Sequence, residues 1–269
     1  MIRIILILLF SFPVALCAQT YQQLSEKAIE YIEMDSLHKA EELLLQALKL
    51  EPKNAMLFSN LGLVQRRMGE YDKALESYSF ALNFAPLAVP ILLDRAAINL
   101  EMGNTDRAYT DYCLVLDEDK QNKEALLMRA YIYVLRRDYP AARIDYNRLL
   151  ELDPQNYSGR LGLATLEQKE GKFKEALEIL NKMIAATPED ATLYIARADV
   201  EREMKHEDLA LVDLEEAIRL KPSSADAYLL RGNIYLTQKK KALAKTDFEK
   251  AISLGIPPAD LHEQLKQCK

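Results

Sequence analysis

Residues 60–86 read NLGLVQRRMGEYDKALESYSFALNFAP and carry small, aromatic and proline residues at spacings that recur throughout the chain. The characteristic residues of this stretch are Leu61, Gly62, Gly69, Tyr71, Ala74, Tyr78, Ala81 and Pro86. Related residues return every 34 positions, before and after the stretch. A period of this length predicts a repeat architecture, in which each repeat buries its apolar face against its neighbours.

Seven consecutive repeats follow from this frame without an insertion, and the last ends at Pro258. Their first residues are Tyr21, Ala55, Val89, Lys123, Tyr157, Ala191 and Ala225. The eighth position is always small: Ala28, Gly62, Ala96, Ala130, Ala164, Ala198 and Gly232. The twentieth position is alanine in every repeat: Ala40, Ala74, Ala108, Ala142, Ala176, Ala210 and Ala244. Since two helices approach closely only where side chains are small, both positions are predicted helix contacts.

These spacings resemble the tetratricopeptide repeat, a helix-turn-helix unit of 34 residues. The resemblance implies an all-α fold, a right-handed superhelical solenoid of seven tandem units in residues 19–258. Residues 259–269 follow two prolines and are predicted to form a C-terminal capping helix over the last apolar face. The composition agrees, because the chain has only 8 glycines and 10 prolines and is rich in helix-forming residues.

Two further positions of the repeat carry a structural prediction. Position 24 is a bulky core residue: Leu44, Tyr78, Tyr112, Tyr146, Leu180, Leu214 and Phe248. Position 32 is a proline that ends the second helix in five repeats: Pro52, Pro86, Pro154, Pro188 and Pro222. Lys120 and Ile256 replace this proline in repeats 3 and 7, so the turns there are expected to be the least uniform.

An ion pair is predicted inside four of the repeats. Position 7 is arginine in repeats 3, 4, 6 and 7: Arg95, Arg129, Arg197 and Arg231. Position 23 is aspartate in the same repeats: Asp111, Asp145, Asp213 and Asp247. The other repeats have neither residue, so the two positions are expected to pair within a repeat and to have a structural role.

The first 18 residues have the pattern of a secretory signal peptide, with Arg3, an apolar run over 4–12 and a small residue, Ala18, before the expected cleavage point. The protein is therefore expected to be exported, to the periplasm of a bacterium or beyond. An uncleaved anchor and lipidation of Cys17, in a stretch similar to a lipobox, are the alternatives. Lipidation would tether the protein to a membrane.

The sequence contains no catalytic or cofactor-binding motif. Its three histidines, His38, His206 and His262, are far apart, and Cys113 and Cys268 are isolated. We therefore expect no catalytic residues, no metal site and no cofactor, and we expect that the protein is not an enzyme. A formal net charge of -6 disfavours a nucleic-acid partner.

The resemblance also implies where a partner would bind, because positions 2, 5, 6, 9, 12 and 13 of the first helix line the concave groove in this family. The predicted partner-binding residues are Leu63, Arg66, Arg67, Leu93, Asp94, Ala97, Leu100, Leu127, Met128, Tyr131, Val134, Leu135 and Leu161. The groove is apolar from Leu93 to Leu161, and polar residues flank it, which is typical of a partner site. These flanking residues are Arg66 and Arg67 on one side and Gln168 and Lys169 on the other. The alternative is that these groove side chains belong to the core.

The expected function is that of a protein–protein interaction scaffold or adaptor of the bacterial cell envelope, which binds a peptide or helix of a partner. A carrier of a small apolar ligand, held around repeats 3–5, is the alternative. Neither the identity of the partner nor the oligomeric state follows from the sequence.

Overall fold

The computed structural model describes residues 20–269, and the predicted signal peptide at 1–18 lies outside them. All regular structure in this part of the chain is helical, in fifteen α-helices and one short 3-10 helix. None of these helices has the length and apolar content required to cross a membrane. The chain divides into two compact units, an N-terminal unit that ends at Lys120 and a C-terminal unit that starts at Gln121.

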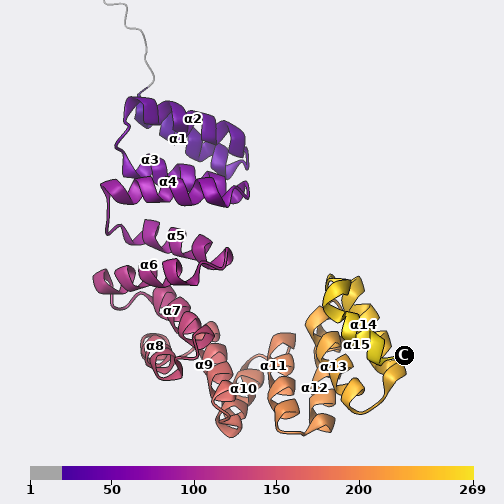
Figure 1. Ribbon diagram of the computed structural model, residues 1–269. Coiled ribbons are helices and arrows are strands. Elements are labelled where there is room, and N and C mark those ends of the chain that lie inside the picture. The colour runs from indigo at the N-terminus through magenta and orange to yellow at the C-terminus, as the bar shows by residue number, and fades with distance from the viewer. Residues whose placement is uncertain (1–19) are drawn as a thin grey trace, which may run out of the picture. The chain divides into compact units, whose positions relative to one another are not determined.

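The N-terminal unit consists of three helical hairpins (Figure 1). Its helices are α1 (Tyr21–Glu33), α2 (Leu37–Leu50), α3 (Ala55–Arg67), α4 (Tyr71–Phe84), α5 (Val89–Glu101) and α6 (Thr105–Glu118). The first helix of each hairpin begins at the residue where the sequence places a repeat start.

The C-terminal unit contains four hairpins and a terminal segment (Figure 1). Its hairpin helices are α7 (Lys123–Leu135), α8 (Tyr139–Leu152), α9 (Tyr157–Lys169), α10 (Phe173–Ala186), α11 (Ala191–Glu203), α12 (Glu207–Leu220), α13 (Ala225–Thr237) and α14 (Lys241–Ser253). The predicted all-α repeat fold is confirmed, with one helical hairpin for each 34-residue repeat.

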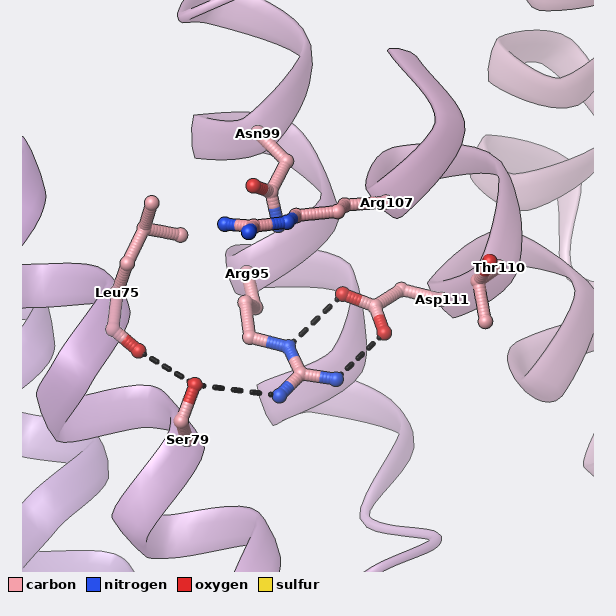
Figure 2. Close-up of a pocket in the computed structure, with 7 residues that line it drawn as sticks. All are labelled: Leu75, Ser79, Arg95, Asn99, Arg107, Thr110 and Asp111. Atoms are coloured by element: carbon pink, nitrogen blue, oxygen red, sulfur yellow. Dashed lines mark hydrogen bonds and ion pairs between the residues drawn. The ribbon is translucent and has the colours of Figure 1, made fainter. Parts of the chain in front are cut away.

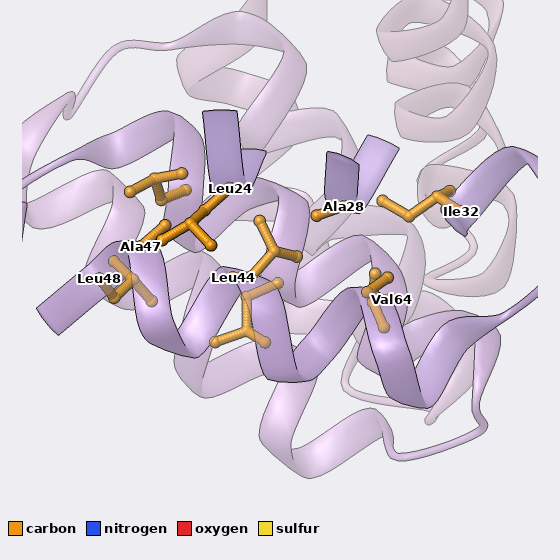
Figure 3. Packing of buried hydrophobic residues seen from close by; sticks show 10 residues of the cluster. Leu24, Ala28, Ile32, Leu44, Ala47, Leu48 and Val64 are labelled. Carbon is orange, nitrogen blue, oxygen red and sulfur yellow. The ribbon is translucent and has the colours of Figure 1, made fainter. Parts of the chain in front are cut away.

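The core lies where the small and bulky positions meet. The alanine at position 20 is 0% exposed in all seven repeats. The bulky residue at position 24 is at most 3% exposed in each repeat. Figure 3 shows one such cluster, in which Leu44 of α2 packs between Leu24 and Ala28 of α1 and Val64 of α3. Burial of these apolar side chains holds the first two hairpins together.

Side-chain caps and prolines set the helix boundaries. Asn54 accepts backbone hydrogen bonds from Met56 and Leu57 at the start of α3, and Asn122 and Asn156 cap α7 and α9 in the same way. The five hairpins with a proline at position 32 end their second helix two residues before it. Of the two turns without this proline, only the one after repeat 7 differs, because α14 has 13 residues instead of 14. The expectation of a less uniform turn is wrong for repeat 3, since α6 has 14 residues and also ends two residues before position 32.

The predicted ion pairs are confirmed in all four repeats. In each, arginine Nε and Nη2 both donate to the aspartate carboxylate, at distances between 2.6 and 2.9 Å. The aspartates are buried, whereas the arginine side chains keep about a fifth to a quarter of their surface in solvent. Each bidentate pair therefore joins the two helices of one repeat and satisfies a buried carboxylate.

The C-terminal segment covers the last hairpin, although it is not one continuous helix. A 3-10 turn (Pro258–Leu261) precedes the short helix α15 (His262–Gln267). Leu261 is 2% exposed and packs with Phe248 and Ala251 of α14. Two prolines at the start of the segment account for the break, since proline lacks the amide hydrogen of a regular helix.

Candidate functional site

The predicted partner-binding residues fall in both compact units. Seven lie on α3 and α5 of the N-terminal unit: Leu63, Arg66, Arg67, Leu93, Asp94, Ala97 and Leu100. None of these seven belongs to the fully buried core. Six of them are half-buried and Arg67 is exposed, so each keeps part of its surface in solvent.

Arg67, one of these seven residues, is bonded to the preceding repeat. Its guanidinium donates to the carbonyl of Ile32 at 2.9 Å and to the carboxylate of Asp35 at 2.8 Å, both in the preceding repeat. These two bonds direct the side chain toward the turn after α1. Arg67 thus links repeats 1 and 2 in the structure.

The charged groups of α3, α4 and α5 form a cluster that we call the Asp94 site, defined by Arg66, Tyr78, Asp94 and Glu101. Arg66 donates to Glu101 at 2.6 Å, while its other terminal nitrogen is 3.9 Å from Asp94. Tyr78 is 0% exposed, and its hydroxyl lies close enough to Asp94 to lower the pKa of that carboxyl. Its ring lies under Gly62, where an added Cβ would be 3.0 Å from the ring.

Burial controls the electrostatics of the Asp94 site. Desolvation raises the pKa of Asp94, and Arg66 and Tyr78 offset this only in part. Desolvation also raises the pKa of Tyr78, with a further contribution from the neighbouring Asp94 charge. Asp94 is therefore a carboxylate whose negative charge is incompletely compensated by the protein.

The other six predicted residues lie in the C-terminal unit, on α7 and α9: Leu127, Met128, Tyr131, Val134, Leu135 and Leu161. Tyr131 and Leu135 are the most open, with 46% and 51% of their surface exposed. Burial, with a smaller contribution from Tyr131, raises the pKa of Tyr146 to about 12. The phenol of Tyr146 thus stays protonated beneath this surface.

An open pocket of about 410 Å³ lies farther along the C-terminal unit, on the first helices of repeats 5, 6 and 7. We call it the repeat 5–7 pocket. Its lining residues are Leu161, Thr165, Gln168, Lys169, Thr192, Ile195, Ala196, Asp199, Asp226, Leu229, Leu230 and Asn233. Leucine, isoleucine and alanine make up its apolar part, and amide, hydroxyl and charged groups surround them.

The polar groups of this pocket are partly organised by the protein. Gln168 is 7% exposed and donates to Asp199 at 2.8 Å and to Glu203 at 3.1 Å. Arg202 also donates to Asp199, at 2.6 Å. The amide of Asn233 lies at the pocket without such a bond, so it can both donate to and accept from a ligand.

Only one predicted residue, Leu161, lines the repeat 5–7 pocket. Ile195, Leu229 and Asn233 were missed, although they occupy positions 5 and 9 of repeats 6 and 7, which the family resemblance assigns to the groove. The groove positions of repeat 6 also include the polar residues Asp199, Arg202 and Glu203, which obscure its apolar contribution in the sequence. Applying the family's groove positions to repeats 6 and 7 as well would have identified Ile195, Leu229 and Asn233.

A second cavity, of about 290 Å³, lies between α4, α5 and α6 (Figure 2). Arg95 crosses it, bound to Asp111 and, at 3.3 Å, to Ser79, whose hydroxyl donates to the Leu75 carbonyl at 2.7 Å. All three guanidinium nitrogens of Arg95 thus have a protein acceptor. Arg95 is therefore committed to the structural ion pair.

No group of three or more His, Cys, Asp or Glu side chains in residues 20–269 is arranged to hold a metal ion.

Comparison with known proteins identifies the repeat. Family models described as Tetratricopeptide repeat match residues 18–54, 43–76, 93–157, 133–200 and 225–254. The structure is similar to the crystal structure of a tetratricopeptide repeat protein from Parabacteroides merdae, with 36% sequence identity and a TM-score of 0.85. That similarity covers 93% of this chain and 99% of the other.

More distant similarities concern the fold alone. Pseudomonas aeruginosa pilF has 17% identity and a TM-score of 0.62, over 77% of this chain and 94% of its own. YrrB, described as a TPR protein with an unusual peptide-binding site, has 19% identity and a TM-score of 0.57, over 73% and 97% of the two chains. A search among curated proteins found no match.

Proposed function

Because the chain belongs to the tetratricopeptide repeat family, we propose that it is a non-enzymatic interaction scaffold that binds an extended peptide or a helix of a partner protein. Proteins with this fold generally serve as scaffolds for protein–protein interaction, and the similar fold of YrrB carries a peptide-binding site.

The observation that carries this proposal is the repeat 5–7 pocket. Ile195 and Leu229 offer an apolar surface to a partner side chain, and the Asn233 amide can pair with a peptide group beside it. The pocket is formed by three helices of one compact unit, so it exists before the partner arrives. A preformed site lowers the entropic cost of binding.

The place of action is part of the proposal. The sequence of residues 1–18 supports export, and we propose that the scaffold works in the cell envelope, either free or tethered through Cys17. Mass spectrometry of the N-terminal peptide from the native host would decide between these forms. Cleavage before Gln19 gives the free form, and acyl chains on Cys17 give the tethered one.

Affinity capture from an envelope extract tests the binding surface. The wild-type bait is compared with a double variant of the pocket, Ile195→Glu with Leu229→Glu, and with a second double variant, Leu127→Glu with Tyr131→Glu, on α7. Val212→Glu is the matched control, because Val212 is 63% exposed on α12 and does not line the pocket.

We expect a partner that wild type and the control retain and that the pocket variant loses. Retention by all baits would contradict the proposed surface, and loss only in the α7 variant would move the site to repeat 4. An apolar small molecule that co-purifies with wild type and not with the α7 variant would favour the alternative, a small-ligand carrier around repeats 3–5.

A further inference from the structure

We propose that the cavity between α4, α5 and α6 binds a carboxylate, held by Arg107 and Asn99 and supplied by a glutamate or aspartate side chain of a partner. The cavity lies in the N-terminal unit and shares no residue with the repeat 5–7 pocket. The carboxylate chemistry follows from the cavity itself, and only the assignment of the carboxylate to a partner protein rests on the proposed function.

Asn99 is the buried polar group of this cavity. Its side chain is only 3% exposed and lines the cavity from α5 (Figure 2). Its Oδ1 accepts a hydrogen bond from Asn104 at 3.4 Å, whereas its Nδ2 makes no hydrogen bond within residues 20–269. A buried amide donor without an acceptor is unfavourable, and a ligand that accepts from it removes this cost. Asn99 therefore offers a donor to a group that enters the cavity.

Other repeats show what satisfies the side chain at this position, which is position 11. Gln65 of repeat 2 donates to Glu41 at 3.2 Å, and Glu167 of repeat 5 accepts from Arg143 at 2.9 Å. Both partners occupy position 21 of the preceding repeat. The residue at that position before repeat 3 is Leu75, whose side chain forms no hydrogen bonds. Repeat 3 therefore lacks the partner that repeats 2 and 5 have.

Arg107 brings an unpaired positive charge to the same cavity. Figure 2 shows its side chain extending from α6 into the cavity. The equivalent Lys73 of repeat 2 pairs with Glu70 at 2.9 Å, whereas repeat 3 has Asn104 in place of that glutamate. No carboxylate of residues 20–269 pairs with Arg107, although the other three arginines of residues 20–120 each bind one. The Arg107 guanidinium is therefore available to an anion.

The charge and size of the cavity favour a carboxylate. Arg95 and Arg107 line it with the single carboxylate of Asp111, so the lining carries one excess positive charge. A carboxylate carries one negative charge, and its two oxygens can accept from a guanidinium and from an amide at once. A volume of about 290 Å³ suits one side chain better than a large ligand. Acidic residues outnumber basic ones in residues 20–120, so an anion that does not reach these donors is repelled.

The experiment is an NMR titration of the intact protein with three small probes. Nα-acetyl-glutamate methylamide carries the proposed carboxylate, the glutamine derivative has the same shape without the charge, and inorganic phosphate is an anion of different geometry. The side-chain amide resonances of Asn99 and the Nε resonance of Arg107 report binding. We expect saturable shifts of both with the glutamate probe, no saturable shift with the glutamine probe, and weaker binding of phosphate.

The variants separate a binding role from a structural one. Arg107→Gln should weaken glutamate-probe binding by about tenfold, because it removes the charged donor. Its melting temperature should equal that of wild type, since Arg107 is exposed and unpaired in the fold. Lys73→Gln is the matched control, because it removes the charge at the same position of repeat 2, and it should leave binding unchanged. Asn99→Asp places a carboxylate inside the cavity and should abolish probe binding, because the new aspartate pairs with Arg107.

Three results would overturn the proposal: no saturable shift with the glutamate probe, equal binding of the glutamine probe, or unchanged binding in Arg107→Gln. Tighter binding of phosphate would overturn the assignment to a carboxylate. Carboxylate binding without a captured partner would leave this site standing and count against the repeat 5–7 pocket. A captured partner that Arg107→Gln retains as well as wild type would overturn the assignment of the carboxylate to that partner.

Discussion

Position 15 of the repeat ends the first helix in a left-handed conformation, and four repeats place a residue other than glycine there. Lys239 has a φ of 59°, whereas the equivalent Gly69 has a φ of 78°. A residue with a side chain costs about 1–2 kcal/mol in this backbone region, and replacing it by glycine removes that cost. The greater conformational freedom of glycine in the unfolded chain cancels part of this stabilisation. Lys239→Gly should stabilise the fold by about 0.5–1 kcal/mol in urea unfolding. Lys240→Gly, at a φ of -83°, should give no gain.

Asp94 provides a pH-dependent prediction. Its pKa is higher in the folded chain than the ordinary value of 3.8, so ionisation of Asp94 costs folding free energy at neutral pH. Asp94→Asn should therefore raise the free energy of unfolding at neutral pH. This gain should shrink as the pH falls toward 3.8, where the native carboxyl is protonated as well. Urea titrations along this pH range measure the effect. A loss of stability at neutral pH would show that the carboxylate supports the fold.

Gly162 of α9 lies at a close contact between neighbouring helices, where the size of a single side chain affects how the helices pack. An added Cβ would lie 2.6 Å from Cε1 of Tyr146 on α8. Glycine to alanine ordinarily stabilises a helix by about 1 kcal/mol. Here Gly162→Ala should instead destabilise the protein by about 1–3 kcal/mol, because the two helices must separate.

A double-mutant cycle tests this explanation. Three repeats have leucine at the position of Tyr146, so Tyr146→Leu is a compatible background. In that background, Gly162→Ala should cost much less or become favourable. The same cost in both backgrounds, measured by urea unfolding, would exclude the ring contact as the cause.

Stability along the whole molecule should follow the order of the repeats, because each hairpin contacts mainly its neighbours. Leu261 packs against Phe248 and covers the apolar face of the last hairpin. Leu261→Ala should lower the free energy of local opening by about 2 kcal/mol or more. Hydrogen exchange should accelerate in α13 and α14 and stay unchanged in α1 to α4. Leu243→Ala, at a site 50% exposed on α14, is the control and should change neither region. Uniform acceleration would indicate one cooperative unit.

The sequence by itself determined the repeat frame, the first residue of each hairpin, the buried alanines and the four ion pairs. Each of these depends on spacing within one or two helices, and that spacing repeats every 34 residues. Arg95 and Asp111, for example, always lie opposite each other once their two helices pack. The predicted groove positions came from the family resemblance, and the repeat frame only transferred them to this chain.

Only the tertiary structure decided which of those positions line a pocket and which bind neighbouring side chains. Arg67 binds Asp35, the pocket lies around Ile195, and Tyr78 is buried beside Asp94. These outcomes depend on side-chain rotamers and on the residues of adjacent repeats. Both differ from one repeat to the next, so the periodic pattern that specified the fold carried no information about them.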